Sequence, residues 1–174
     1  MRNHCSIFKK NSRIAAVDAK MTLDSHDKKI LAAVQLDARY GLENLAAETG
    51  LSTASVQRRL RRLRQEGFIT AEVAVVDPAK LGQAMTFVVM VELDRERLDQ
   101  IDAFARRANA EPQVQQCYYV TGDADFCLIC TASDMPDFEA LTHRLFFDSA
   151  NVRRFRTSVV MGRKKVGLGV PVPD

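Results

Sequence analysis

The spacing of apolar residues between positions 51 and 66 predicts an amphipathic helix. Val56, Leu60 and Leu63 recur at intervals of four and three residues, which places them on one face of a helix. Ser52 precedes them as a favourable N-cap, because its hydroxyl can accept a hydrogen bond from a first-turn amide. The other positions are mostly polar and rich in arginine. We therefore expect one face of this helix to be buried and the rest to be exposed.

Two further helices are predicted upstream of this one. Residues 42–49 carry one apolar face and are followed at once by Gly50, while an earlier helix opens near Asp24 and buries Ile30. Asp24 can cap that earlier helix, and Asp27 favours the positive end of its dipole. Two helices joined by a short turn that contains glycine form a helix-turn-helix in outline. In that motif the second helix enters the major groove of DNA.

Beyond the helices the apolar pattern becomes strand-like. Residues 68–73 follow Gly67, a favourable helix stop, and predict a short strand that would begin a wing. Residues 74–84 form a linker that contains turn residues. Four strands and two helices are then predicted in the order strand, helix, strand, strand, helix, strand: 85–93, 95–108, 114–120, 125–132, 136–146 and 152–161. That order is typical of a ferredoxin-like βαββαβ unit.

The helices of such a unit would cover only one face of the sheet. By alternation, the opposite face carries Val88, Met90 and either Cys117 or Tyr119. Exposed apolar surfaces of this kind mark interfaces, so we expect a second subunit to pack there. The predicted fold class is α+β, with an N-terminal winged helix-turn-helix and a C-terminal ferredoxin-like βαββαβ domain.

The charge pattern points to a local rather than a general affinity for anions. The chain holds 25 basic and 22 acidic residues, a net charge of +3, yet five arginines lie between Arg58 and Arg64. Local clustering of this kind is a footprint of nucleic-acid binding, although a merely solvated helix is the alternative. The candidate contacts to bases or backbone are Ser52, Thr53, Ser55, Gln57 and Arg58, and the candidate phosphate partners are Arg61 and Arg62.

The sequence Cys127-Leu128-Ile129-Cys130 has the C-x-x-C spacing that can indicate zinc or redox chemistry. It lies within an apolar run of strand character, where side chains three positions apart point to opposite faces. The two thiols should therefore diverge, and no second ligand pair is close in sequence. We interpret these cysteines as small buried apolar residues, and we predict no metal and no cofactor.

The ends of the chain and its location are predicted from composition. No apolar run approaches the roughly twenty residues that a membrane helix needs, and residues 14–17 are too short for the core of a secretion signal. Residues 1–21 are polar and basic and are expected to be a flexible arm, or an upstream start ahead of Met21. Residues 166–174 form a tail. We expect a cytoplasmic protein with no membrane partner.

Several motifs together resemble one family. The motifs are L-D-x-x-D-x-x-I-L at 23–31, A-R-Y-G-L-E-N-L-A at 38–46, G-L-S-x-x-x-V-x-R-R-L-R-R-L-R-x-x-G-F-I at 50–69, D-P-A-K-L-G in the linker, P-Q-V-Q-Q-C-Y-Y-V-T-G-D-A-D-F in the second half, and T-S-V-V-M in the last strand. These motifs resemble the Lrp/AsnC, or feast/famine, regulators. The resemblance covers residues 22 to about 165, and two unrelated halves of the chain agree on it.

The resemblance implies an effector-sensing transcriptional regulator. It implies a winged helix-turn-helix at 22–73, a linker at 74–84, and an effector-binding and oligomerisation domain at 85–165. It further implies homodimers through the sheet faces, often assembled to octamers, and transcription control by an amino acid or related small molecule. In that family the effector lies between dimers. The positions carried over to this chain are Gly122, Asp123, Asp125, Thr157 and Ser158.

The chemistry of these positions suits an amino acid. A carboxylate can receive its ammonium group, while hydroxyls and a glycine turn can meet its carboxylate. The plain alternative is that Gly122 and Asp123 only form a hairpin turn. Ala124 stands where many relatives carry a larger residue, which leaves the identity of the ligand open.

Two other functions compete with this one. An architectural protein would wrap double-stranded DNA without any effector. Some proteins that resemble the family are haem-precursor decarboxylases, which use histidine and arginine around a tetrapyrrole. The histidines here are His4, His26 and His143, and no nucleophile–base pair accompanies them in the sequence. We therefore predict that the protein is not an enzyme.

Overall fold

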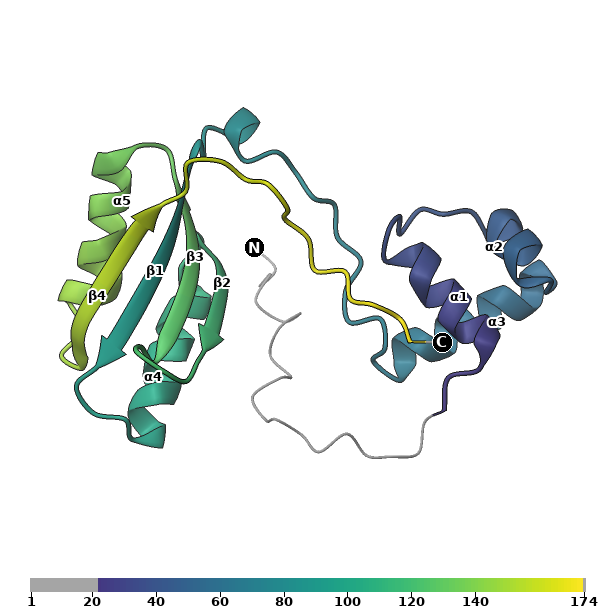
Figure 1. Cartoon of the computed structure of the whole chain (residues 1–174), viewed down its shortest axis with the longest axis horizontal. Coiled ribbons are helices and arrows are strands. Elements are labelled where there is room, and N and C mark those ends of the chain that lie inside the picture. The colour runs from purple at the N-terminus through teal and green to yellow at the C-terminus, as the bar shows by residue number, and fades with distance from the viewer. Residues whose placement is uncertain (1–21, 174) are drawn as a thin grey trace. The chain divides into compact units, whose positions relative to one another are not determined.

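The computed structural model describes residues 22–173, so the predictions for residues 1–21 lie outside the described part of the chain (Figure 1). The chain divides into two compact units. Among the described residues, one comprises 22–75 together with the tail 166–173, and the other is Val76–Lys165. The division falls inside the predicted linker. The tail was not expected to join the first unit, and it does so through Gln35, whose side-chain amide exchanges two hydrogen bonds with the backbone of Val170.

The three predicted helices of the first unit are confirmed as α1 (Ser25–Val34), α2 (Leu42–Thr49) and α3 (Thr53–Gln65). Gly50 ends α2 with a φ of 71°, a left-handed conformation that glycine adopts without steric cost. The core of this unit is a small cluster of five buried side chains, one from α1, one from α2 and three from α3: Ile30, Leu45, Val56, Leu60 and Leu63. The stripe predicted from periodicity is therefore the face by which α3 packs on the other two helices.

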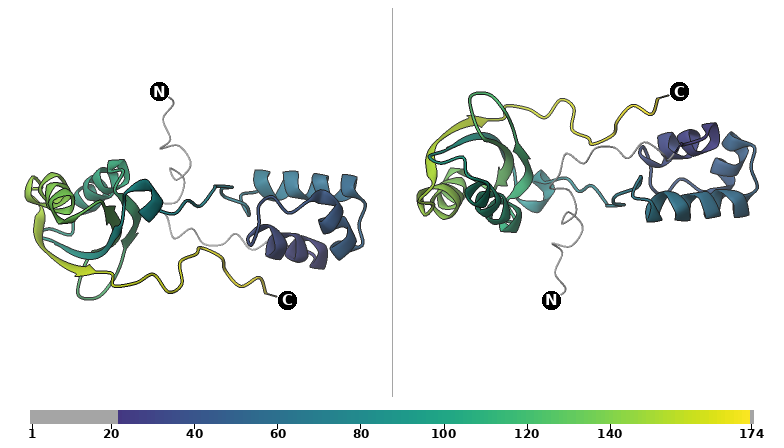
Figure 2. Two further views of the ribbon diagram at one scale, coloured as in Figure 1. Left: turned by 90° about the horizontal axis from the view of Figure 1, so that it is seen from above. Right: turned by 90° about the horizontal axis from the view of Figure 1, so that it is seen from below.

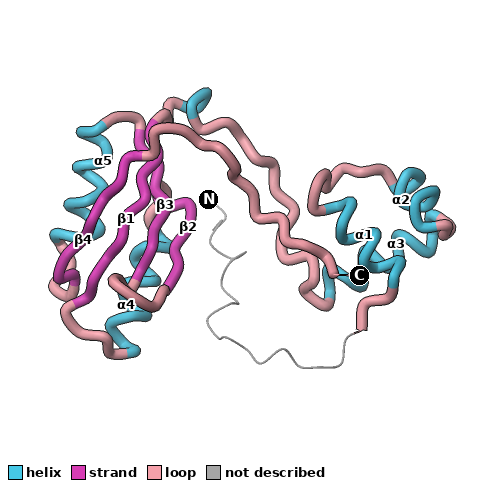
Figure 3. Tube along the Cα trace, in the orientation of Figure 1, coloured by secondary structure: helices cyan, strands magenta, loops and turns pink. Residues whose placement is uncertain are grey.

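The short strand predicted at residues 68–73 is wrong for this chain. The segment between α3 and the one-turn helix η2 (Ala79–Leu81) has no strand among the described residues. A strand needs a hydrogen-bonded neighbour, and this segment instead contributes Glu72, which pairs with Arg64 of α3. Figure 3 shows the segment as a loop. The helix-turn-helix is thus present in this chain without the wing strand.

The second unit has the predicted βαββαβ order. Its strands are β1 (Met85–Leu93), β2 (Val114–Tyr119), β3 (Phe126–Ala132) and β4 (Val152–Val159), and its helices are α4 (Leu98–Ala110), α5 (Met135–Thr142) and the π-helical turn η3 (His143–Phe147). The four strands form one antiparallel sheet in the order β2-β3-β1-β4. Helices α4 and α5 lie on the same face of the sheet (Figures 1 and 2).

Strand alternation divides the sheet into a packed and an open face. Phe87, Val89 and Val91 of β1 point to the helices and are fully buried in the main core. Val88 and Met90 point the other way, beside Ile129 and Cys127 of β3, and are partly exposed. The prediction that one sheet face is left open by the helices is therefore confirmed for the described chain.

The assignment of Cys117 or Tyr119 to the open face is wrong. Both lie on the helix side: Cys117 packs against the main core, and the ring of Tyr119 is 5.4 Å from that of buried Phe126. The cause is a register shift between β2 and β3 after Val114. One extra residue reverses which face every later side chain meets.

The cysteines of β3 diverge as predicted. Cys130 lies in the main core, whereas Cys127 pairs with Met90 on the open face. Burial raises the pKa of the Cys130 thiol to about 12 and that of Cys117 to about 11. Thiols held protonated are poor nucleophiles and poor metal ligands. No group of three or more possible metal-binding side chains is found between residues 22 and 173. None of the helices in that range has the length and apolarity that a bilayer span requires.

Candidate nucleic-acid interface and effector site

Helix α3 begins with a well-formed cap. The hydroxyl of Ser52 accepts a hydrogen bond from the Ser55 amide at 3.2 Å, and it donates to the Ser55 hydroxyl at 3.0 Å. Thr53, Gln57 and Arg58 are exposed on the first two turns. The predicted front-end contacts are therefore accessible, except that the two serine hydroxyls also bond to each other. The N-terminal residues of a recognition helix are the ones that contact base edges.

A buried carboxylate on α1 holds two of the five arginines of α3. The side chain of Asp27 is 1% exposed, and its Oδ1 lies 2.8 Å from Nη1 of Arg59 while its Oδ2 accepts a hydrogen bond from Arg62. Nη1 of Arg59 also lies 2.7 Å from Oδ2 of Asp24. Arg59 and Arg62 therefore join the recognition helix to α1 instead of projecting freely from it. Arg62 was predicted to contact a phosphate, and in this structure it is paired with Asp27 instead.

Asp24 and Asp27 form a reciprocal capping box at the start of α1. Each carboxylate accepts from the backbone amide of the other residue, at 2.8 Å and 3.3 Å. The bond from the Asp27 amide, aided by Arg59, lowers the pKa of Asp24 to about 2. The sequence predicted the cap but not the arginine partners, because residues more than thirty positions apart meet only once the helices have packed.

The other three arginines of α3 differ in whether a carboxylate pairs with them. Arg64 forms two hydrogen bonds to Glu72, at 3.1 Å and 2.7 Å. Arg58 and Arg61 are exposed and form no ion pair within residues 22–173. They are thus the two cations of α3 that can meet a phosphate or a base without first giving up a protein partner.

The second candidate site lies at the hairpin turn between β2 and β3. Gly122 has a φ of 120°, which favours glycine, and Asp123 is exposed beside it. The guanidinium of Arg156 donates to the Asp123 carbonyl at 3.0 Å. Ala124, in the middle of the turn, is buried. The turn is therefore braced by a β4 side chain from across the open face of the sheet.

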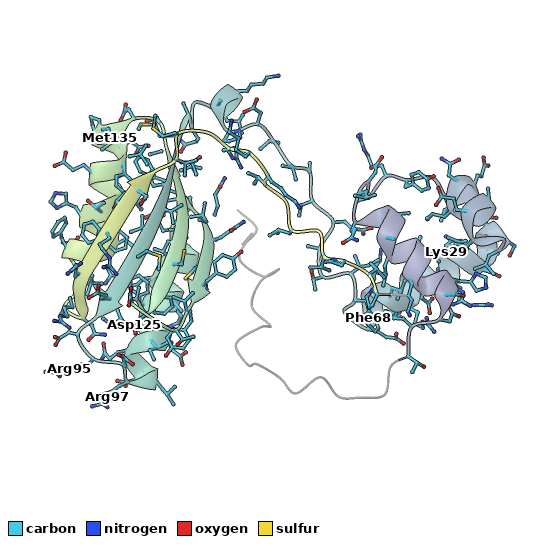
Figure 4. The ribbon with its side chains drawn as sticks, in the orientation of Figure 1. Lys29, Phe68, Arg95, Arg97, Asp125 and Met135 are labelled. Carbon is cyan, nitrogen blue, oxygen red and sulfur yellow. The ribbon has the colours of Figure 1, made fainter. Side chains whose placement is uncertain are left out.

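Asp125 closes the end of β1. Its amide donates to the Val91 carbonyl at 2.9 Å, and its Oδ2 accepts from the Leu93 amide at 2.6 Å. Its Oδ1 has no hydrogen bond among the described residues. One oxygen of this carboxylate is therefore structural and the other is available. Figure 4 shows Asp125 at the end of the sheet that also carries Arg95 and Arg97.

Thr157 and Ser158 do not join Asp125 within one chain. Thr157 pairs with Val89 and Ser158 with Val88, four residues or more along β1 from the Leu93 amide that Asp125 binds. That offset is roughly 13 Å along the strands, with two strand spacings of about 5 Å each across them. Alternation also turns Thr157 and Ser158 to opposite faces. The five predicted effector positions therefore form two separate groups.

Charged residues that sequence reasoning did not assign to the site lie near the turn. Glu92 on the open face forms ion pairs with two arginines of β4. Its Oε1 lies 3.3 Å from Nη2 of Arg156 and 3.9 Å from Nε of Arg154. Their alternation along β4 was visible in the sequence, but only the pairing of β4 with β1 brings them to the same end as Asp123 and Asp125. This end of the sheet offers both signs of charge to a small zwitterion.

Both halves of the chain match known domain families. Residues 23–64 match the AsnC-type helix-turn-helix domain, and residues 86–169 match the Lrp/AsnC ligand binding domain. An HTH-type transcriptional regulator of Sinorhizobium fredii is 44% identical over 162 residues, which is 93% of this chain and 96% of that protein. A leucine-responsive regulatory protein of Rhizobium meliloti is 30% identical over 88% of this chain and 98% of its own length.

Solved structures agree with the sequence matches. The crystal structure of a transcriptional regulator from Neisseria meningitidis in complex with L-Met superposes with a TM-score of 0.80 at 26% identity. The match covers 86% of this chain and 97% of the Neisseria chain. The similarity therefore extends through the helix-turn-helix and the sheet domain together.

Proposed function

The chain belongs to the Lrp/AsnC family of transcriptional regulators, and from this premise we propose that it binds specific duplex DNA through α3 and responds to an amino acid or a related small molecule. The family consists of regulators rather than enzymes. The protein would act where chromosomal DNA is found, in the cytoplasm. Each of its two domains supports one part of the proposal, the helix-turn-helix for DNA and the sheet domain for the effector.

The DNA proposal rests on which arginines of α3 are paired with carboxylates and which are not. Asp27 and Glu72 occupy three of them, and Arg58 and Arg61 remain exposed without an acidic partner among the described residues. Arg58 lies near the front of the helix, where base contacts are made, with Ser52, Thr53, Ser55 and Gln57 around it. Arg61 is one turn further and is suited to a phosphate, and Arg62 would join it only by leaving Asp27.

The test is DNA affinity measured across a range of salt concentrations. Each lost phosphate contact should reduce the log–log salt slope by roughly 0.9, so replacing Arg58 and Arg61 by alanine should reduce it by up to about 1.8. Arg95→Ala with Arg97→Ala removes the same charge from exposed positions of the sheet domain and serves as the control. An α3 double variant whose affinity and slope equal those of the control would refute this role.

The effector proposal rests on the chemistry at the end of the sheet. The Neisseria relative was crystallised with L-Met, and a Rhizobium relative is named for its response to leucine. Here the carboxylates of Asp123 and Asp125 would meet the ammonium group of an amino acid, and the Gly122 turn would meet its carboxylate. Because Thr157 and Ser158 lie far from Asp125 in one chain, they would contribute to the same site only from another protomer. A homodimer formed through the open sheet face, assembling further to an octamer, would supply that protomer.

Asp125→Asn tests this site directly. The asparagine oxygen can still accept from the Leu93 amide, so the variant removes the charge while keeping the bond that closes β1. DNA binding by the parent should change when an amino acid from a panel of twenty is added, and the variant should bind DNA without that change. Asp102→Asn on the exposed face of α4 is the control. A variant that responds like the parent would exclude Asp125 from the site.

The titration and an absorbance spectrum distinguish the two alternative functions, an architectural protein and a tetrapyrrole enzyme. An architectural protein would bind DNA equally with and without every amino acid of the panel. A tetrapyrrole enzyme would show absorbance between roughly 350 and 450 nm in the purified protein, which is the region where cofactors of that class absorb.

A further inference from the structure

A concave surface lies at the β4 edge of the sheet, which is the edge opposite to β2. It has a volume of about 330 Å³ and lies between η3 and the first half of the edge strand β4. Phe147 and Phe155 form its aromatic wall, and Ser149, Arg153 and Arg154 lie around them. Its size is at the lower end of the range for small-molecule sites, which begins near roughly 300 Å³. The predicted effector residues do not line it.

The aromatic wall depends on the π-helical turn. In η3 the neighbouring residues Phe146 and Phe147 point apart: Phe146 is buried in the core, whereas Phe147 is 64% exposed. Phe146 stacks on Phe155 at 4.5 Å, and Phe147 meets the same ring edge-on at 5.5 Å. Single π-helical turns are rare and occur frequently at functional sites. Here the turn presents a large aromatic side chain to solvent beside the hollow.

The charge around the hollow is positive. Arg153 is exposed and forms no ion pair with any residue of the described chain, whereas Arg154 is 3.9 Å from Glu92 and remains more than half exposed. None of the residues that line the hollow is acidic. An arginine fork beside an aromatic wall matches a carboxylate carried on an apolar group, because the fork binds the two oxygens together.

We propose that this hollow is a binding site for a small carboxylic acid with an aromatic or branched apolar side chain. The carboxylate binds Arg153, with the Ser149 hydroxyl beside it, and the apolar group packs on Phe147 and Phe155. None of Gly122, Asp123, Asp125, Thr157 and Ser158 lines this hollow, which shares only Arg154 with the charged groups described near Asp125. The proposal does not depend on the role of Asp125. The protein would then have a second place at which a metabolite can act on the sheet domain.

Arg153 has a simpler alternative role, because edge strands often carry charges that prevent pairing with another chain. If that were its only role, neither ligand binding nor Phe147 would be involved. A second copy of the chain is the other competing occupant of the hollow, and sedimentation of the Arg153 and Phe147 variants distinguishes this case.

The test uses 3-phenylpropanoate as the probe, titrated into the full-length protein by calorimetry, with 3-phenylpropanamide as the neutral analogue. The parent should bind the acid and should bind the amide at least roughly tenfold more weakly, since a hydrogen bond to a charged group contributes about that factor. Arg153→Gln and Phe147→Ala should each weaken the acid by a similar factor or more. Arg163→Gln, an exposed arginine outside the hollow, should not.

Asp125→Asn distinguishes this site from the proposed effector site, because the variant should bind the acid as the parent does. The inference is overturned if the parent binds no acid at millimolar concentration, or if Arg153→Gln and Phe147→Ala bind it like the parent. It is equally overturned if either variant changes the sedimentation coefficient of the parent, which would make the hollow an interface between copies.

Discussion

Replacing Asp27 by alanine should destabilise the helix-turn-helix by leaving two arginines without their shared partner. The carboxylate is 1% exposed and accepts from Arg59, from Arg62 and from the Asp24 amide. Removing one partner of a buried ion pair costs about 3–5 kcal/mol. Arg59 and Arg62 are 22% and 44% exposed, so both can recover some hydration. We therefore expect a loss of about 2–4 kcal/mol.

That loss is large relative to the stability of the unit. A compact unit of this size has about 3–8 kcal/mol of unfolding free energy, from about 0.05–0.15 kcal/mol per residue. Asp27→Ala should thus unfold the three-helix unit at urea concentrations that leave the sheet domain intact. DNA affinity should fall even though Asp27 itself faces away from solvent and is not a proposed contact.

Urea unfolding followed by circular dichroism and by amide exchange of α1 and α3 measures the effect. A second variant, Asp27→Ala with Arg59→Met, removes one of the two stranded charges, the less exposed one, and should recover part of the lost stability, because apolar replacement of a buried ion pair is often tolerated. Lys29→Ala, on an exposed position of the same helix, is the control. If Asp27→Ala changed the unfolding free energy by less than about 0.5 kcal/mol, as surface substitutions do, the ion pairs would not hold α3 in place.

Three further outcomes are expected. The folded-state pKa of Asp24, about 2, lies below its ordinary value of 3.8, so its contribution to stability is present above pH 3.8 and is lost as the pH falls through 2; Asp24→Asn should flatten the acid limb of thermal unfolding of the helix unit between these values. Met90→Asp places a charge at the centre of the open sheet face and should convert the proposed dimer to a monomer in sedimentation at micromolar concentration, whereas Asn109→Asp, at an exposed position of α4, should not. Gln35→Ala removes both side-chain hydrogen bonds to Val170 and should speed proteolysis of the tail without changing the melting temperature of the sheet domain, and an unchanged cleavage rate would show that these bonds do not retain the tail.

Much of the fold follows from interactions between residues close in sequence. The period of Val56, Leu60 and Leu63, the Ser52 cap and the glycine after α2 act within one or two turns, so α2 and α3 were predicted nearly to the residue. Strand β1 was predicted with both ends correct because its length and apolarity are local properties. The motifs for the two family domains are likewise contiguous in the chain.

Other features depend on partners that only the tertiary structure brings together. Periodicity cannot show that Asp27 would take Arg59 and Arg62, because more than thirty residues separate them and the crossing of α1 and α3 decides which side chains meet. The face occupied by Tyr119 was reversed by a single register shift after Val114.

The candidate effector site shows the same distinction. The turn containing Gly122 was evident from the sequence, because a tight hairpin needs such residues. The neighbours of this turn were not evident, because the pairing of β4 with β1 decides them. That pairing brings the Arg156 side chain to the Asp123 carbonyl, and it places Thr157 opposite Val89, four residues along β1 from the Leu93 amide that Asp125 binds. Local patterns therefore determined the elements of this protein, whereas strand register and helix packing decided which charges face one another, because those contacts join residues that are distant along the chain.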